Sequence, residues 1–278
     1  MMSKHLIRVN ESKSSMAEVY RVLRNNIEFA YNNSNVKSVL VTSTKNGEGK
    51  TTVAANLAVT MANGGKKVLL IDCNLNSPSL HKIFKVENNV GLTTILNNEK
   101  CDSEIINKTS YENLYLLTSG VNSERFSELL MSKRISDFFN VAKENYDFVI
   151  VDSPSVMERS DAQIISQYVD GCLLVIGSGQ VNKEEVKKTK ELLKKVNAKI
   201  LGAVLNKTEE RKKDGPNIKE YENAIVTEVV KVQEPQENQS LRSSRRVRNS
   251  RRDRKSRKKG IFAKFFTFVI TMIIILKH

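Results

Sequence analysis

Residues 39–52 read VLVTSTKNGEGKTT, an apolar run followed by a loop with two glycines and then by a helical pattern. Two further apolar runs have the same form, because residues 68–71 end on Asp72 and residues 148–151 end on Asp152. Short, unbroken apolar runs are typical of strands buried on both faces of a parallel sheet. The sequence therefore predicts that the glycine loop and the two aspartates each follow a strand of one sheet.

Apolar runs and helical patterns alternate from residue 36 to residue 206. Strands are expected at 36–43, 67–72, 114–119, 146–152, 171–177 and 199–206. Helical patterns lie at 50–63, in short pieces over 80–106, in two pieces over 123–145, and at 160–168 and 182–197. Strands separated by helices form βαβ units. The predicted fold class is therefore α/β, with a doubly wound, mostly parallel sheet and helices on both of its faces.

Residues 44–52, here called the phosphate loop, have the composition of a nucleotide-binding loop. Two glycines let the backbone approach a phosphate closely, and the helix that follows offers N–H groups to an anion. Lys50 would contact the β- and γ-phosphates, and the Thr51 hydroxyl would ligate magnesium. The pattern G-x-x-x-x-G-K-[ST] is met except at its first position, where Thr44 stands. The predicted nucleotide-binding residues are Lys45, Asn46, Gly47, Glu48, Gly49, Lys50, Thr51 and Thr52. A tight turn between strand and helix is the alternative.

Asp72 and Asp152 are the candidate metal ligands. Ligands of open α/β sheets bind at the carboxyl ends of the strands, and Mg²⁺ prefers one or two carboxylates with phosphate oxygens and waters. ATP and Mg²⁺ are therefore expected, with Thr51, Asp72 and Asp152 around the metal. Asp152 fits metal support, and Asp72 fits the polarisation of an attacking hydroxyl or water, so Lys50, Asp72 and Asp152 are the candidate catalytic residues. Either aspartate could instead only cap the segment that follows it.

The three cysteines and three histidines are scattered, with no C-x-x-C pair. This argues against a disulfide framework and against a metal site built from side-chain nitrogen and sulfur. The scattered cysteines suit a reducing cytosol, so a cytoplasmic protein is expected, and the N-terminus has no apolar signal segment. The net charge is +14, and residues 241–278 hold 13 basic residues against one acid, a balance of +12. The remaining +2 belongs to residues 1–240, so the predicted folded body is nearly neutral.

The C-terminal part has three compositions: a polar linker over 208–241, a basic segment over 242–260 and an apolar tail over 261–278. The basic segment has no interleaved aromatic residues, which argues against nucleic acid. Residues 265–276 are uncharged but too few to span a bilayer. A basic segment beside an apolar one gives two membrane signals, so attachment to the inner face of the plasma membrane is expected. The alternative is an extension with no anchoring role.

These motifs resemble those of the bacterial tyrosine kinases of capsule and exopolysaccharide synthesis, the BY-kinases, which are related to the chromosome-partitioning and septum-positioning ATPases. The resemblance covers about residues 11–206. It implies ATP-dependent phosphorylation of protein tyrosines, self-phosphorylation included, by a kinase bound to a membrane modulator protein of polysaccharide export. The matching stretches are residues 42–43, 47–50, 54–58, 68–72, 78–82, 91–92, 128–130, 146–154, 161–162 and 202–206.

The resemblance also implies roles outside the phosphate loop. Glu18, Arg21 and Arg24 match an E-x-x-R-x-x-R helix that joins subunits into a ring, within an N-terminal oligomerisation segment over 1–35; on spacing alone the alternative is a solvated charged face. Asn206 would read the adenine through its amide. Lys45 stands where the partitioning ATPases have a signature lysine that crosses a dimer interface, and an exposed loop lysine is the alternative.

The chain departs from the family pattern in three places. The family's D-x-D-x-R element is here residues 72–76, in which Asn74 brings no charge and cannot act as a base, and Asn76 replaces an arginine that could pair with phosphate. After the last predicted strand there is only Tyr221, so the usual tyrosine cluster is missing. Two alternatives to the kinase therefore stay open: a nucleotide-switched positioning ATPase and a nucleotide-binding scaffold without catalysis.

Overall fold

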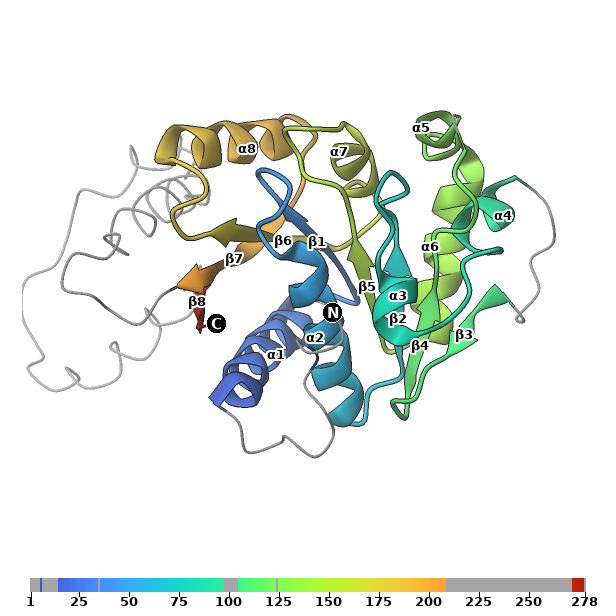
Figure 1. Cartoon of the computed structure of the whole chain (residues 1–278), viewed down its shortest axis with the longest axis horizontal. Helices are drawn as coiled ribbons and strands as arrows, with labels where there is room; N and C mark the ends of the chain where they lie inside the picture. The colour runs from blue at the N-terminus through green and yellow to red at the C-terminus, as the bar shows by residue number, and fades with distance from the viewer. Residues whose placement is uncertain are drawn as a thin grey trace, which may run out of the picture.

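The computed structural model of this 278-residue chain describes residue 6 and residues 15–34, 36–97, 105–123, 125–208 and 272–277. Its centre is a sheet of eight strands in the order β3-β4-β2-β5-β1-β6-β7-β8, with helices packed on both faces (Figure 1). The strands are β1 (Ser38–Ser43), β2 (Val68–Asp72), β3 (Asn107–Lys108), β4 (Leu114–Leu117), β5 (Phe148–Asp152), β6 (Gly171–Gly177), β7 (Ile200–Thr208) and β8 (Met272–Lys277).

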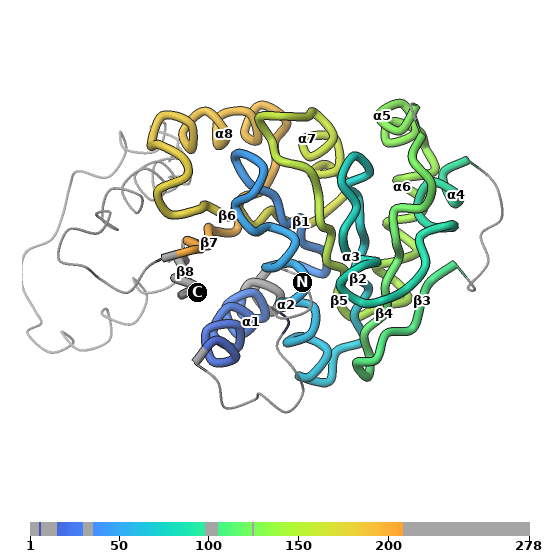
Figure 2. Tube along the Cα trace, in the orientation of Figure 1, coloured from blue at the N-terminus to red at the C-terminus, as the bar shows by residue number. Residues whose placement is uncertain are grey.

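Neighbouring strands are parallel throughout the sheet, apart from the antiparallel pair of β3 and β4. The carboxyl ends of the parallel strands therefore lie at one edge. The loops after β1, β2 and β5 lie next to one another at the upper edge of the molecule in Figure 2. This edge is where the fold can hold a ligand.

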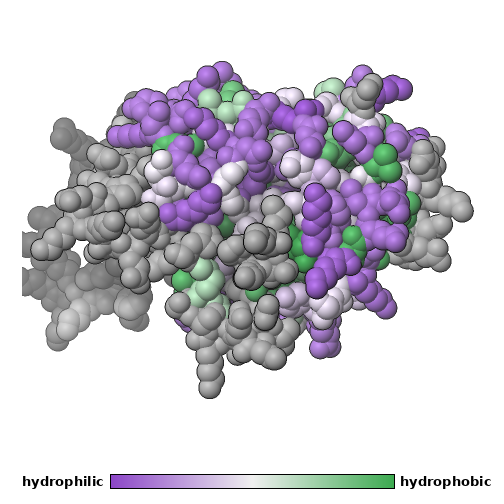
Figure 3. Space-filling model, viewed as in Figure 1, coloured by the Kyte–Doolittle hydropathy of each residue, from purple (hydrophilic) through white to green (hydrophobic). Residues whose placement is uncertain are grey.

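The helices are α1 (Ser15–Ser34), α2 (Lys50–Asn63), α3 (Leu80–Phe84), α4 (Leu92–Leu96), α5 (Phe126–Leu129), α6 (Lys133–Asn145), α7 (Asp161–Ile165) and α8 (Lys183–Lys195). Helix α8 begins with a capping box in which Asn182 and Glu185 exchange hydrogen bonds between side chain and backbone. Hydrophilic residues dominate the described part of the face in Figure 3, including the region over α8.

Alternate residues of the central strand β1 enter two separate cores, because successive side chains of a strand point to opposite faces. In β1, Val39 and Val41 join the core under α1 and α2, whereas Leu40 joins the core under α4–α7. Both cores need apolar strand residues, which explains why the runs in the sequence are unbroken. The predicted α/β fold class is confirmed.

Two strands were not expected from the sequence. β3 has only two residues, both polar, so it leaves no apolar signal. β8 comes from the apolar tail and pairs with the outer edge of β7, consistent with the strand preference of its isoleucine-rich sequence. The linker, the basic segment and Tyr221 lie outside the described residues. Within the described ranges, no helix combines the length and apolar character needed to cross a membrane.

Candidate active site

Asp72 and Asp152 occupy adjacent positions on neighbouring strands. β2 and β5 pair in parallel with Asp72 opposite Asp152 at their carboxyl ends, and Asp152 is also the register partner of Val41 in β1. β1 runs directly into the phosphate loop. The two carboxylates and the loop that the sequence predicted to converge are therefore brought to one place.

The surroundings of the two carboxylates differ. Asp72 accepts hydrogen bonds from the backbone N–H groups of Asn74, Ser79 and Leu80, each at 3.1 Å. Both oxygens of Asp152 are buried without a hydrogen-bond partner among the described residues. Burying an unpaired carboxylate is costly, so Asp152 presents the donor set that a hard cation would satisfy.

Burial raises the pKa of both carboxyl groups. For Asp152 the negative charge of Asp72 adds to the effect of burial, whereas Lys50 and Thr51 lower the pKa in part. For Asp72 the three backbone N–H bonds and Lys50 oppose the effect of burial. Two adjacent buried carboxylates cannot both be charged cheaply, which further fits a site completed by a divalent cation.

The phosphate loop reaches its shape through two glycines in the left-handed region. Gly47 has a φ of 85° and Gly49 a φ of 95°, and α2 begins directly afterwards at Lys50. The Lys50 ammonium donates to Oδ1 of Asn46 at 3.2 Å. Because the ammonium bonds a side chain of the same loop, it already lies over the loop that is expected to bind phosphate.

Glu48 turns its side chain into the fold. Its carboxylate accepts from the backbone N–H of Lys45 at 2.5 Å and from that of Gly177 at 2.7 Å. Burial raises the pKa of Glu48, and these N–H groups oppose the shift. The side chain therefore holds the phosphate loop against the end of β6.

Asn206 lies beneath the phosphate loop. Its Nδ2 donates to the backbone oxygen of Glu48 at 2.8 Å, and its Oδ1 is buried without a partner among the described residues. A Cβ on Gly49 would lie 2.1 Å from this Nδ2, whereas a Cβ on Gly47 would meet nothing within 4 Å. Gly49 is thus required for packing as well as for its backbone angle.

Replacing Gly49 by alanine is therefore expected to lower the free energy of unfolding more than replacing Gly47. Both substitutions place alanine in the left-handed region, at a cost of about 1–2 kcal/mol, but only Gly49→Ala also overlaps Asn206. Urea unfolding of the two variants measures the difference. In the double variant Gly49→Ala/Asn206→Ala the excess loss should largely disappear, and an equal loss in the two single variants would contradict this packing.

Other predicted site residues take different positions. The Lys45 ammonium pairs with Glu185 of α8 at 2.5 Å, and the Lys45 side chain is 45% exposed. On α1, Arg21 pairs with Glu18, while Arg24 turns toward α2 and donates to the backbone oxygen of Thr60 at 3.4 Å. Arg24 therefore contacts the same chain, a contact that the E-x-x-R-x-x-R spacing could not reveal.

The segment after β5 contributes two residues that the sequence did not single out. Glu158 accepts from the backbone N–H of Asn46 at 3.0 Å. Arg159 faces the amide of Asn76, whose oxygen, when turned toward the guanidinium, accepts from Nη1 at 2.5 Å and from Nε at 3.1 Å. Neither residue belongs to a motif or a periodic pattern, so only the three-dimensional arrangement identifies them.

Comparison with known proteins gives the family. Residues 36–204 match the family described as AAA domain. The chain is 43% identical over 205 residues to "Tyrosine-protein kinase YwqD" of Bacillus subtilis (strain 168), an alignment that covers 74% of the chain and 86% of YwqD. The chain belongs to the bacterial tyrosine-kinase family.

Solved structures agree with this membership. The crystal structure of the chimerical protein CapA2B2 superposes with a TM-score of 0.70 at 41% identity, covering 73% of this chain and 89% of CapA2B2. The septum site-determining protein MinD of Pyrococcus horikoshii OT3, solved with Mg-ADP, is more distant, with a TM-score of 0.58 at 27% identity over 67% of this chain and 76% of MinD. The kinase family therefore shares the nucleotide-binding fold of the positioning ATPases, and this chain lies closer to the kinases.

Proposed function

We propose that the chain is an ATP-dependent protein tyrosine kinase that phosphorylates itself and other proteins and regulates capsule or exopolysaccharide synthesis. The observation that carries the proposal is the cross-strand pair of Asp72 and Asp152 beside the phosphate loop. Family membership supports the choice of tyrosine as the acceptor. The greater similarity to the kinases than to MinD favours this function over a positioning ATPase.

The residues have separate roles in this proposal. The backbone of residues 46–52 and the Lys50 ammonium bind the phosphates, and Lys50 neutralises charge on the γ-phosphate. Asn206, with its unpartnered Oδ1, faces the adenine. Thr51, Asp72 and Asp152 hold Mg²⁺, and the buried unpaired oxygens of Asp152 fit that metal. Bound there, Mg²⁺ supplies positive charge that neutralises and orients the β- and γ-phosphates.

Asp72 orients the acceptor. The phenolic oxygen of tyrosine forms a bond to the γ-phosphorus, the bond from that phosphorus to the β–γ bridging oxygen breaks, and ADP leaves with the electron pair. The Asp72 carboxylate accepts the phenolic proton. Three backbone N–H bonds hold the Asp72 carboxylate in place, which suits a base that must be positioned at the acceptor hydroxyl.

Self-association through α1 is part of the proposal. Val22 and Phe29 are 45% and 52% exposed on this helix, on the same side as Glu18. An apolar stripe beside charged residues fits a contact between subunits. We also propose a membrane modulator protein as partner, and a cytoplasmic location at the inner face of the membrane, reached through the modulator and the basic C-terminal segment. The apolar tail is not part of this proposal, because its residues 272–277 pair with β7 as β8.

The activity test uses the full chain with γ-labelled ATP, Mg²⁺ and a tyrosine peptide. Phosphotyrosine that appears with the wild-type chain and is lost in Lys50→Met supports the kinase. Release of phosphate without phosphotyrosine would favour a positioning ATPase, and nucleotide binding with neither product would favour a scaffold.

Tyr221 is the expected site of self-phosphorylation. Several tyrosines of the folded body are poor acceptors, since Tyr20 is buried, the rings of Tyr115 and Tyr146 pack against each other with centroids 5.5 Å apart, and the Tyr168 hydroxyl donates to the Leu130 oxygen at 3.0 Å. Tyr221→Phe should therefore remove most self-labelling and leave phosphorylation of an added peptide unchanged. Mass spectrometry of the labelled chain measures this, with Tyr146→Phe as the matched control. Unchanged labelling of Tyr221→Phe would place the acceptor elsewhere.

A further inference from the structure

We infer that Arg159 supplies, from the segment after β5, the guanidinium that is absent at position 76, and that it neutralises charge on the transferring phosphoryl group. This role rests on the proposed kinase function and adds a charged group to its machinery. It also addresses the departure at Asn76, where a neutral amide stands in the element that follows β2.

The contacts of Arg159 hold it at the junction of two loops. Its Nε donates to Oδ2 of Asp161 at 2.7 Å, and the amide oxygen of Asn76 accepts from Nε and Nη1. Asp161 is buried, and its other oxygen accepts from the Ser127 hydroxyl at 2.7 Å. The Arg159 side chain is 39% exposed, and its bonds to Asp161 and Asn76 involve Nε and Nη1 of a guanidinium that carries five N–H donors. The Asp161 carboxylate therefore orients the guanidinium, which keeps further N–H groups that can donate to a phosphate.

The two loops that Arg159 joins follow the two strands that bear the aspartates. Asn76 lies four residues after Asp72, in a loop that the Asp72 carboxylate folds back through its bonds to Ser79 and Leu80. Arg159 lies seven residues after Asp152. Since Asp72 and Asp152 are register partners, the contact between Asn76 and Arg159 joins the two loops that follow this pair.

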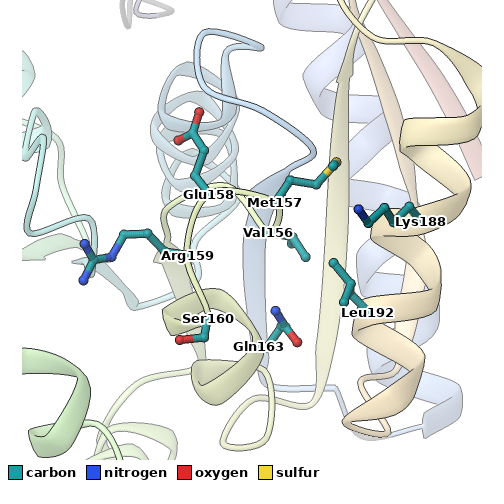
Figure 4. Close-up of a pocket in the computed structure, with 8 residues that line it drawn as sticks. All are labelled: Val156, Met157, Glu158, Arg159, Ser160, Gln163, Lys188 and Leu192. Atoms are coloured by element: carbon teal, nitrogen blue, oxygen red, sulfur yellow. The ribbon is translucent and has the colours of Figure 1, made fainter.

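The same segment also rests on the phosphate loop. Met157 donates its backbone N–H to the Thr44 oxygen at 3.2 Å, and the next residue, Glu158, accepts from Asn46. In Figure 4 the Arg159 side chain points away from Lys188 and Leu192, which line the groove beside α8. Arg159 thus extends toward the loop after β2, while the neighbouring Met157 and Glu158 bond the phosphate loop.

The charges proposed for the site leave room for a further cation. Asp72 and Asp152 carry two negative charges that offset the two positive charges of the proposed Mg²⁺, so Lys50 is left as the cation that neutralises the phosphoryl group. Phosphoryl transfer is catalysed mainly by positioning and charge neutralisation, and an arginine supplied by the same chain can serve this purpose. A guanidinium can donate two parallel N–H bonds to phosphate oxygens. If Arg159 donated to a charged phosphate oxygen instead of the neutral Asn76 amide oxygen, its hydrogen bonds would be stronger.

The experiment compares Arg159→Ala, Arg159→Lys and the double variant Asn76→Arg/Arg159→Ala. Arg125→Ala is the matched control, because Arg125 pairs with Glu128 on the exposed surface next to α5. Two experiments are carried out on each full-length variant. The first measures kcat and KM for phosphorylation of a tyrosine peptide, and the second measures the affinity for Mg-ADP with and without aluminium fluoride, which mimics the transferring phosphoryl group.

Arg159→Ala is expected to lower kcat about a hundredfold, with the KM for ATP and the affinity for Mg-ADP changed by no more than about threefold. The tightening of Mg-ADP binding by aluminium fluoride should be lost. Arg159→Lys should recover part of the kcat and part of the tightening by aluminium fluoride, since lysine keeps the charge but lacks the planar guanidinium. The double variant Asn76→Arg/Arg159→Ala should recover most of the kcat and most of the tightening by aluminium fluoride. It places a guanidinium between the same two loops, now from the loop after β2. Arg125→Ala should behave as the wild type.

Three results would overturn the inference and leave the kinase proposal intact. The first is a kcat of Arg159→Ala near that of the wild type. The second is an equal loss of Mg-ADP affinity with and without aluminium fluoride, which would mean a structural bridge only. The third is an Asn76→Arg/Arg159→Ala variant that folds as the wild type in urea unfolding and recovers nothing. Absence of phosphotyrosine with the wild-type chain would overturn the proposed function instead, and the aluminium fluoride measurement would then decide the role of Arg159 by itself.

Discussion

Replacing Lys50 by methionine is expected to lower the rate of tyrosine phosphorylation by about a thousandfold or more. The ammonium lies over the phosphate loop and bonds the side chain of Asn46, so its removal takes away the positive charge that meets the β- and γ-phosphates. Methionine keeps the apolar stem of a side chain that is almost fully buried. The fold should therefore survive, and initial rates of peptide phosphorylation with saturating ATP measure the loss.

Lys199→Met is the matched control for this substitution. Lys199 is exposed at the amino end of β7, at the opposite edge of the sheet from the phosphate loop. The rate of tyrosine phosphorylation by Lys199→Met should therefore equal that of the wild type. Urea unfolding of both variants separates a local loss of charge from a loss of fold. A folded Lys50→Met protein that retained more than about a tenth of the wild-type rate would contradict the position of Lys50 at the γ-phosphate.

Replacing Asp152 by asparagine is expected to have opposite effects on activity and on stability. Activity should fall by about a hundredfold or more, because the metal loses a charged ligand. Without metal, the free energy of unfolding should rise by about 2 kcal/mol, because the substitution removes a buried charge that has no partner and that faces Asp72. Thermal unfolding with and without Mg-ADP measures both effects. Without Mg-ADP the Asp152→Asn variant should have a higher Tm than the wild type, and Mg-ADP should raise its Tm by less.

Asp170→Asn tests whether this gain is specific to the site. Asp170 is also an aspartate at a strand end, but its Oδ2 accepts from the backbone N–H groups of Lys37 and Ser38 and from the Ser38 hydroxyl, each at 2.8 Å. A carboxylate with hydrogen-bond partners stabilises the fold, so Asp170→Asn should lower the free energy of unfolding by about 2 kcal/mol. Destabilisation of the metal-free protein by Asp152→Asn as well would contradict the unpaired state of Asp152.

The raised pKa values of Asp72 and Asp152 also fix the sign of a pH effect. In the folded protein these groups hold protons more tightly than in the unfolded chain, where carboxyl groups titrate at about pH 4. Stability from this source is present at low pH and is lost as the pH rises through the raised values toward and past neutrality. The free energy of unfolding of the metal-free protein should fall over this pH window. The fall should be smaller in Asp152→Asn, and Mg-ADP should suppress it in the wild type.

The parts of the site that depend on strand ends could be predicted from the sequence. Buried parallel strands leave unbroken apolar runs, and their carboxyl ends must meet at one edge, so the meeting of Lys50, Asp72 and Asp152 follows from local patterns. β3 could not be predicted, because a two-residue antiparallel edge strand buries too little to leave a pattern. β8 was missed because an apolar run at the end of a chain fits a membrane-binding tail as well as an edge strand.

Contacts between distant side chains could not be predicted either. Asn206 could be placed at the end of its strand, but its position beneath Gly49 depends on the register between β6 and β7. The pairing of Lys45 with Glu185 depends on where α8 crosses the sheet, and the meeting of Asn76 with Arg159 depends on the shapes of two loops. None of these contacts has a fixed spacing along the chain.

The Glu48 carboxylate has a consequence for the kinetics of nucleotide binding. Because it bonds the backbone N–H groups of both Lys45 and Gly177, contacts within the chain itself fix the shape of the loop. Association then needs no slow rearrangement, and a rate constant on the order of 10⁶ M⁻¹ s⁻¹ or faster is expected. Differences in affinity between nucleotides should consequently reside in how long each one stays bound.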